Sequence, residues 1–363
     1  MISKHINHAT MAAFVGVTLL ASSWTMSATL YTQTNSASGN EVQVYESAPD
    51  GIPTLVAQAA TGGLGSGAGL GSQGALALSS GHGFLFAVNA GSNDVSSFEV
   101  GPHGLRLVSR VSSGGTTPIS LATHGDLLYV LNAGGSGNIA GFQIHHDGSL
   151  EAITGSSQPL SSAASGPAQI GFDRDGDALV VTEKATGKIV VYHVVDGRAG
   201  EPEVRASHGI TPFGFAFDRR DNLLVSEAFA GQANASALSS YDFDDGELSL
   251  ESGSVPSEQT AACWVVTARH GRFAYVTNTG SGTTTGYEIA HDGKLARLTP
   301  NGITGITGGG PTDATTDRDG DTLFILSPSI GQIVTFHVNP EGSLTRLGVA
   351  SGVAATAASL VAR

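Results

Sequence analysis

Residues 167–183 read PAQIGFDRDGDALVVTE: an apolar segment, a turn rich in aspartate and glycine, and a second apolar segment that ends on a polar residue. The pattern recurs at 73–89, 118–132, 212–227, 262–278 and 311–327. The closing polar residues follow one another at intervals of 43, 51, 44, 51 and 49 positions, and they are Asn89, Asn132, Glu183, Glu227, Asn278 and Ser327. Repeats of this length are typical of β-propeller blades.

Each copy continues into two further apolar segments. After 167–183 comes KIVVYHV at 188–194, and in the preceding repeat the turn HDG at 146–148 leads into SLEAI at 149–153. Asp-Gly between apolar segments favours a tight hairpin turn, because glycine tolerates a positive φ. Each repeat therefore predicts a four-stranded antiparallel blade.

The two ends of the repeat region complete one another. Residues 29–35 (TLYTQTN) resemble the second apolar segment of a repeat, but no matching first segment lies directly before them. The third and fourth segments follow as EVQVYES at 41–47 and IPTLVAQ at 52–58. Residues 354–362 (AATAASLVA) form a first segment without a second. The sequence thus predicts an all-β fold, a single seven-bladed β-propeller over 29–363, closed by pairing of the N-terminal strand with the C-terminal strand. Such closure removes a free sheet edge.

Charge and cysteine content exclude several classes of function. The formal net charge is −14, and the 17 lysines and arginines are dispersed. Nucleic-acid binding depends on phosphate neutralisation by such residues, so we expect no nucleic-acid partner and no anionic membrane surface. The single cysteine, Cys263, excludes an intramolecular disulfide and a cysteine-rich zinc site. It has no basic sequence neighbour, so burial beside Trp264 is expected rather than a nucleophilic role.

Two further motifs resemble ligand loops without completing them. The acidic turns at 173–177 and 317–321 resemble calcium loops, but a hairpin turn explains both. The glycine-rich segment 62–74 (GGLGSGAGLGSQG) lacks the Lys-Ser/Thr ending of a phosphate-binding loop and precedes a strand. We therefore predict no metal and no cofactor.

The N-terminus has the three parts of a secretory signal. Lys4 lies in a segment without acidic residues, MAAFVGVTLL follows at 11–20, and small residues lead to Ala28. The apolar run is too short to span a bilayer. Residues 1–28 are predicted to be a signal peptide of a periplasmic or secreted protein, without a transmembrane segment in the mature chain. The alternative is a cytoplasmic protein with a buried N-terminal helix or interfacial anchor.

In a propeller, the ends of the second strands and the segments leading into the first strands lie on one face, near the centre. This face is the default ligand site. At the second-strand ends the sequence places Asn35 and the six closing polar residues named above. The segments leading into the first strands supply Gln73, Pro118, Gln169, His208, Thr211, Cys263, Trp264 and Asp313.

Glu183 and Glu227 occupy equivalent positions in adjacent repeats. A crowded carboxylate has a raised pKa and can serve as a general acid or base. The alternative is that both cap the following loop, as asparagine does at equivalent positions. His208 is the histidine placed near this face, as an assisting base or as an ordinary loop residue. Asn89, Asn132, Asn278, Gln73, Gln169, Trp264 and Asp313 are the predicted ligand-binding residues.

The chain resembles the lactonase family of seven-bladed propellers, which includes 6-phosphogluconolactonases of the cycloisomerase type and 3-carboxymuconate cyclases. The resemblance rests on FLFAVNAGSNDVSSFEV at 84–100, GPAQIGFDRDGDALVVTE at 166–183 and HDGSL at 146–150. It implies catalysis by arginine, histidine and glutamate near the centre of the ring. Glu183 matches the family's glutamate, whereas Ala168 and Gln169 stand where arginine and histidine are expected.

Two hypotheses follow. In the first, an exported lactonase-like enzyme hydrolyses or isomerises a small, uncharged lactone, with Glu183 or Glu227 as general acid or base and His208 assisting. An uncharged substrate is expected because a phosphorylated or polycarboxylate lactone needs cationic donors. In the second, a non-catalytic propeller binds a small-molecule ligand or a protein through the same face.

Overall fold

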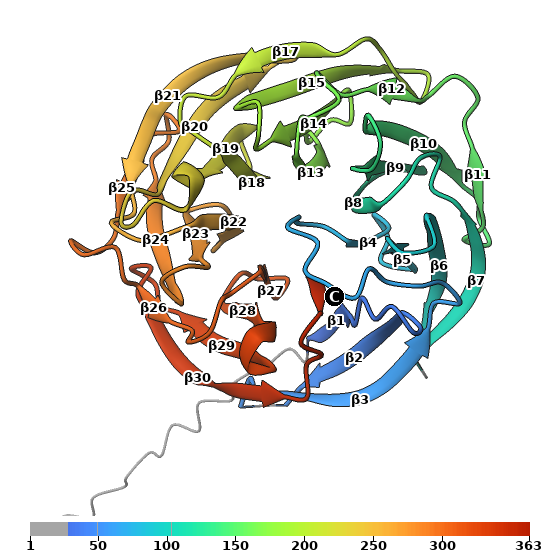
Figure 1. Cartoon of the computed structure of the whole chain (residues 1–363). Coiled ribbons are helices and arrows are strands. Elements are labelled where there is room, and N and C mark those ends of the chain that lie inside the picture. The colour runs from blue at the N-terminus through green and yellow to red at the C-terminus, as the bar shows by residue number, and fades with distance from the viewer. Residues whose placement is uncertain (1–27, 49, 103) are drawn as a thin grey trace, which may run out of the picture.

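A computed structural model describes residues 28–48, 50–102 and 104–363. Their strands form seven antiparallel sheets arranged in a ring (Figure 1). The predicted seven-bladed propeller is confirmed. The predicted signal peptide at 1–28 lies outside the described residues except for Ala28.

Blades 1 to 3 follow one another along the chain, and in each the first strand named lies nearest the centre. Blade 1 contains β4 (Leu76–Leu78), β5 (Phe84–Asn89), β6 (Asp94–Gly101) and β7 (Gly104–Ser112). Blade 2 contains β8 (Pro118–His124), β9 (Leu127–Asn132), β10 (Asn138–Ile144), β11 (Leu150–Ala152) and β12 (Gln158–Pro159). Blade 3 contains β13 (Pro167–Phe172), β14 (Ala178–Glu183), β15 (Lys188–Val195), β16 (Arg198–Ala199) and β17 (Glu203–Ala206).

Blades 4 to 6 repeat this order. Blade 4 contains β18 (Pro212–Phe217), β19 (Asn222–Glu227), β20 (Ala237–Asp244) and β21 (Glu247–Pro256). Blade 5 contains β22 (Ala262–Ala268), β23 (Phe273–Asn278), β24 (Thr283–Ile289), β25 (Leu295–Arg297) and β26 (Gly305–Ile306). Blade 6 contains β27 (Asp313–Thr316), β28 (Thr322–Ser327), β29 (Gln332–Val338) and β30 (Leu344–Ser351).

Blade 7 closes the ring with strands from both ends of the chain. Its order is β31 (Ala358–Ala362), β1 (Thr29–Gln33), β2 (Glu41–Ser47) and β3 (Pro53–Ala60). β31 pairs antiparallel with β1, with Leu30 opposite Ala362 and Gln33 opposite Ala358. The predicted closure is confirmed.

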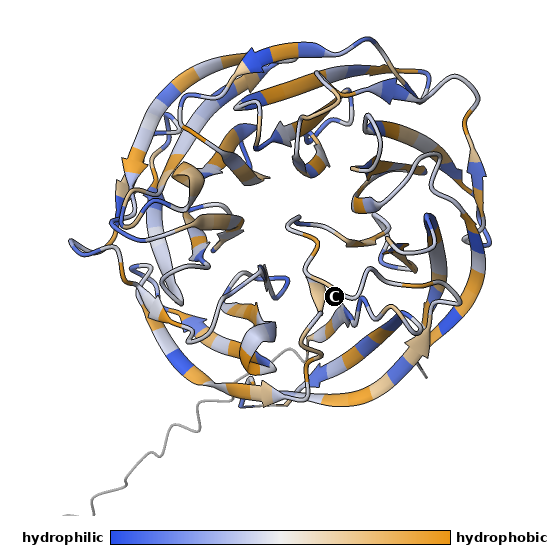
Figure 2. Cartoon of the chain, viewed as in Figure 1, coloured by the Kyte–Doolittle hydropathy of each residue, from blue (hydrophilic) through white to orange (hydrophobic). Residues whose placement is uncertain are grey.

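The core consists of seven apolar clusters, one between each pair of adjacent blades. Alternate residues of a strand point to opposite faces of its sheet. Phe86 and Val88 of β5 accordingly pack toward blade 2, whereas Leu85 and Ala87 pack toward blade 7. This two-sided burial explains why the second segments are continuously apolar. The outermost strands instead alternate hydrophilic and hydrophobic residues (Figure 2).

A repeated backbone feature shapes the start of the first strands. The residues directly before β8, β18 and β22 adopt a left-handed φ: +53° at Thr117, +59° at Thr211 and +55° at Ala261. A shift in register follows within each of these strands. Such a bulge re-aims the side chains next to it. The conformation recurs around the ring, so at Thr211 it reflects the architecture of a blade rather than a special site.

Candidate functional site

The seven polar side chains at the ends of the second strands are all completely buried: Asn35, Asn89, Asn132, Glu183, Glu227, Asn278 and Ser327. They lie on the predicted face, but beneath the loops that connect the blades. Gly63 and Gly115 in these loops approach so closely that a Cβ atom would lie 2.4 Å from the Asn89 Cγ and 2.6 Å from the Asn132 Cγ. The ring of side chains is therefore covered by backbone.

Three of the predicted asparagines bond neighbouring segments. The Asn89 amide donates to Asp94 and Ser96, and its oxygen accepts from Asn40 and Thr61. Asn132 donates to the Ser113 carbonyl, 3.1 Å away. Asn278 donates to Thr283 and Thr285. These bonds hold the loops on the ends of the blades.

The Glu183 carboxylate is saturated with hydrogen-bond donors. Its Oε1 accepts from the Ser161 backbone N–H at 2.9 Å, and its Oε2 accepts from the Ser161 hydroxyl and, at 2.6 Å, from the Thr186 hydroxyl. Three donors satisfy a buried carboxylate without a counter-ion. The arrangement favours a loop-capping role for Glu183.

Glu227 is held in the same way in blade 4. Its Oε1 accepts from the Gly209 N–H at 2.9 Å and from the Ser239 hydroxyl, and its Oε2 accepts from the Ser254 hydroxyl at 2.6 Å. Burial raises the pKa of Glu227, and the three donors and the charge of the nearby His208 oppose that rise. A Cβ atom at Gly209 would lie 2.0 Å from the Glu227 Cδ, so only glycine fits over this carboxylate.

An open groove runs between blades 3 and 4, above both glutamates. It has a volume of about 520 Å³ and is lined by Lys184, Ala185, Thr186, Gly187, Ser207, His208, Gly209, Ile210, Thr211 and Ala230. We call it the Lys184–His208 groove. Thr186 and Gly209, which line it, donate to Glu183 and Glu227, so the buried carboxylates lie directly beneath it. His208 is exposed here, and its backbone N–H donates to the Tyr241 hydroxyl at 2.8 Å.

Lys184 lines the groove and was not among the functional residues predicted from the sequence. Its Nζ donates to the Gly71 carbonyl at 2.5 Å and lies 4.6 Å from the centre of the Phe213 ring. Burial lowers the pKa of Lys184 to about 8. A single lysine after a strand matches no functional motif. The sequence feature that could have indicated its role is its position directly after Glu183, at the predicted ligand-binding face.

The centre of this face is occupied by the glycine-rich segment that leads into β4. Figure 1 shows this segment reaching toward the middle of the ring. The Gln73 side chain bonds both backbone groups of Val265 in blade 5, and its backbone N–H donates to Ala168 in blade 3. The Ser120 hydroxyl in blade 2 donates to the Gln73 carbonyl at 2.6 Å. Gln73 thus ties three blades together across the centre.

The other predicted central residues also make structural contacts. Gln169 exchanges two hydrogen bonds with the backbone of Phe215 in the next blade. The buried Trp264 ring lies edge-on to Phe213, with 4.7 Å between ring centres. Burial raises the pKa of the Cys263 thiol to about 11, which disfavours the nucleophilic thiolate.

Asp313 is buried where blade 6 meets the closing strand. Its carboxylate accepts from the Ala314 and Leu360 backbone N–H groups at 2.8 and 2.9 Å, with the Gln73 side chain beside it. Burial raises the pKa of Asp313 to about 7. Asp313 therefore touches both the central segment and β31.

The described residues contain neither a metal-binding cluster nor a membrane-spanning helix. Within residues 28–48, 50–102 and 104–363, no group of three or more histidine, cysteine or acidic side chains is placed to hold a metal ion. In the same part of the chain, no helix has the length and apolar character needed to cross a bilayer.

Comparison with solved structures identifies proteins of the same fold. A "putative 6-phosphogluconolactonase" from Bacteroides fragilis is 17% identical, with 94% of this chain and 99% of that chain covered and a TM-score of 0.70. The chain has the fold of the lactonase-type propellers. A Lactobacillus plantarum protein is 18% identical over 93% of this chain and 100% of that chain, with a TM-score of 0.76.

A periplasmic gluconolactonase from Pseudomonas aeruginosa is 17% identical, with 93% of this chain and 99% of that chain covered and a TM-score of 0.70. No family model and no curated protein matches the sequence. At these identities the structural neighbours establish the propeller fold of the chain.

Proposed function

We propose that the protein hydrolyses a small, uncharged lactone in the Lys184–His208 groove. The observation that carries the proposal is that an exposed histidine and a half-buried lysine whose pKa is lowered both line one open groove. Both the fold resemblance and the neighbour named as a gluconolactonase support this reaction class.

His208 acts as the general base. Its imidazole takes a proton from water as the water oxygen attacks the lactone carbonyl carbon. The Lys184 ammonium donates to the carbonyl oxygen, where negative charge develops. The ring C–O bond then breaks, and the imidazolium returns its proton to the leaving alkoxide, so the product is a hydroxy acid.

The buried glutamates act through their position. Glu227 accepts from the Gly209 N–H and so fixes the loop that carries His208. Glu183 fixes the turn that carries Lys184, because it accepts from the Thr186 hydroxyl in that turn and from Ser161 in the loop before β13. In this proposal neither carboxylate transfers a proton, since each is already engaged by three donors.

The groove favours an uncharged substrate. Lys184 is the cation among its described lining residues, and no arginine lines it. A phosphate or a second carboxylate would lie above two buried carboxylates without the paired donors that an arginine supplies.

A panel of neutral lactones, assayed for acid release, tests the proposal. We expect turnover by the full chain, lost in His208→Gln and in Lys184→Met, and unchanged in His146→Gln, an exposed histidine outside the groove. The rate should fall as pH rises above about 8, where Lys184 loses its proton. Absence of turnover throughout the panel, or full activity in His208→Gln, would overturn the proposal.

The second candidate is a non-catalytic propeller that binds a small molecule in the same groove. The saturation of both carboxylates favours it, because the predicted acid and base are structural. Calorimetry with the same lactones separates the two: binding that weakens in Lys184→Met, without acid release, supports the second candidate.

Export of the protein remains our proposal as well. Ala28 is buried, and its carbonyl accepts from the Ser47 N–H at 2.8 Å. A signal peptidase that cuts just before Ala28, one residue short of the end of the predicted 1–28 segment, preserves this bond.

A further inference from the structure

A cavity lies on the opposite face of the ring, away from the Lys184–His208 groove. It has a volume of about 1020 Å³. Its walls come from three blades: β1, β2, β3 and β31 of blade 7, the turn at 80–82 with Gly101, Pro102 and Gly104 of blade 1, and the turn at 316–318 of blade 6. A space of this size accommodates a small organic molecule.

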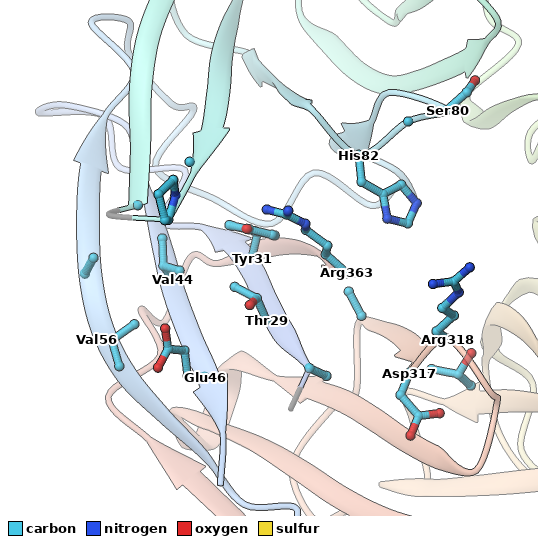
Figure 3. A pocket seen from close by; sticks show the side chains of 18 residues that line it. Thr29, Tyr31, Val44, Glu46, Val56, Ser80, His82, Asp317, Arg318 and Arg363 are labelled. Atoms are coloured by element: carbon cyan, nitrogen blue, oxygen red, sulfur yellow. The ribbon is translucent and has the colours of Figure 1, made fainter. Parts of the chain in front are cut away.

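Three cationic or ionisable basic side chains reach this cavity from three different blades. Figure 3 shows Arg363, His82 and Arg318 around one space. Each comes from a separate segment, so they meet there because of the ring architecture rather than sequence proximity. The same lining also contains the carboxylates of Glu46 and Asp317, so the position of the charges within the cavity matters more than their sum.

Arg318 has no ion-pair or hydrogen-bond partner among the described residues. It forms no ion pair with its neighbour Asp317, whose Oδ1 accepts from the backbone N–H groups of Asp321 and Thr322 at 2.9 and 3.1 Å. The donors of the Arg318 guanidinium are therefore free for a ligand, as far as the described residues extend.

Arg363 and His82 are held at the cavity by their surroundings. The Arg363 guanidinium lies beside the Tyr31 hydroxyl, and its charge opposes the rise that burial causes in the pKa of Tyr31. His82 adopts a left-handed φ of +54° at the tip of its turn, which a non-glycine residue adopts at a cost. Neither side chain forms an ion pair with a described carboxylate.

The cavity is polarised along its length. Glu46 lines the end formed by blade 7, and Figure 3 shows it on the other side of Thr29 from Arg318. Apolar side chains, among them Val44 and Val56, lie near that end. The Arg363 side chain is directed toward Tyr31, whereas Arg318 and His82 lie at the other end of the cavity (Figure 3). A ligand would therefore direct an anionic group toward Arg318 and His82 and a neutral body toward Val44 and Val56.

We propose that this cavity is a binding site for a small organic oxyanion, a carboxylate or a phosphate monoester with a neutral body. Arginine guanidinium groups bind the two oxygens of such anions in a bidentate manner. The site is independent of the proposed hydrolysis, since it shares no residue with the Lys184–His208 groove.

Calorimetric titration of the full chain with sodium gluconate and with inorganic phosphate, at low ionic strength, tests the proposal. We expect saturable binding of gluconate that Arg318→Ala weakens about tenfold or more, the scale of one lost charge-assisted hydrogen bond. The matched control is Arg346→Ala, which removes the same charge from an exposed position on β30 outside the cavity. Glucose, a neutral body without the anion, should not compete.

The outcomes decide the proposal. Equal weakening in Arg318→Ala and Arg346→Ala would show a general charge effect and overturn it, as would the absence of binding. Stronger phosphate than gluconate binding would assign the phosphate monoester class. Amide chemical-shift changes provide a second readout in the unaltered protein: they should map to residues 80–82 and 316–318, and changes confined to other blades would also overturn the proposal.

Discussion

At the scale of single residues, Glu183 and Glu227 illustrate how a carboxylate near a groove can have its oxygens occupied by hydrogen bonds within the protein. Each lies at the end of a second strand, where the sequence predicted it, and each accepts three hydrogen bonds from neighbouring segments. At the same position in other blades, Asn89, Asn132 and Asn278 instead donate through the side-chain amide.

This reading predicts that Glu227→Gln destabilises the fold. The glutamine NH₂ group would face either the Gly209 N–H, which cannot accept, or Ser254, whose hydroxyl would have to turn from donor to acceptor. Either arrangement also replaces charge-assisted hydrogen bonds by neutral ones, and the expected loss is about 1–3 kcal/mol. Chemical denaturation should show the loss, and Glu201→Gln, an exposed glutamate, should not. Unchanged stability combined with abolished lactone turnover would instead assign Glu227 to proton transfer.

At the scale of elements, a buried carboxylate links the closing strand to blade 6, in addition to their apolar packing. Asp313 at the start of β27 accepts from the Leu360 N–H of β31, and no described basic side chain neutralises it. Burial outweighs these hydrogen bonds and raises the pKa of Asp313 to about 7. The fold is therefore more stable when this carboxyl group is protonated, because burial of the charged form costs more than its hydrogen bonds return.

The sign of the resulting pH dependence is fixed by linkage. Between about pH 4, where an unfolded aspartate ionises, and pH 7, the folded chain binds the extra proton, so its stability falls as pH rises and levels off above pH 7. The slope contributed by Asp313 approaches about 1.4 kcal/mol per pH unit.

Denaturation midpoints from pH 4.5 to 8 measure this contribution. The stability difference between the native sequence and Asp313→Asn should change across that range in favour of the variant at higher pH. Asp175→Asn, at an exposed turn carboxylate, serves as the control with a flat difference. A flat difference for Asp313→Asn as well would contradict the assigned role.

At the scale of the whole molecule, the sequence predicted the ring but not what fills its centre. Strand periodicity and repeat length are local signals, and burial of β5 or β14 between two blades makes them strong. Gln73 bonds Val265, 192 positions away, through backbone groups that carry no sequence signature. Lys184 likewise acquires its lowered pKa only through burial beside Phe213 and Gly71, which folding brings together.

Closure of the ring is a property of the whole molecule, and its removal is testable. A variant that ends at Ala357 lacks β31, so β1 loses its pairing with Ala358, Val361 and Ala362, and Asp313 loses the Leu360 donor. The exposed β1 edge should then promote self-association. We expect a lower melting temperature and oligomers in light scattering.

Deletion of Arg363 alone is the matched control, because it leaves every residue of β31 in place. A synthetic peptide with the sequence of 352–363 should restore the monomer and the melting temperature when added to the variant that ends at Ala357, since it supplies the missing strand to a preformed edge. A variant that stays monomeric and equally stable without the peptide would show that six blades and the β1–β3 sheet hold the ring by packing alone. The apolar clusters between the blades argue against that result, because β31 contributes to two of them. Leu360 belongs to the cluster between blades 6 and 7, and Ala358 belongs to the cluster between blades 1 and 2.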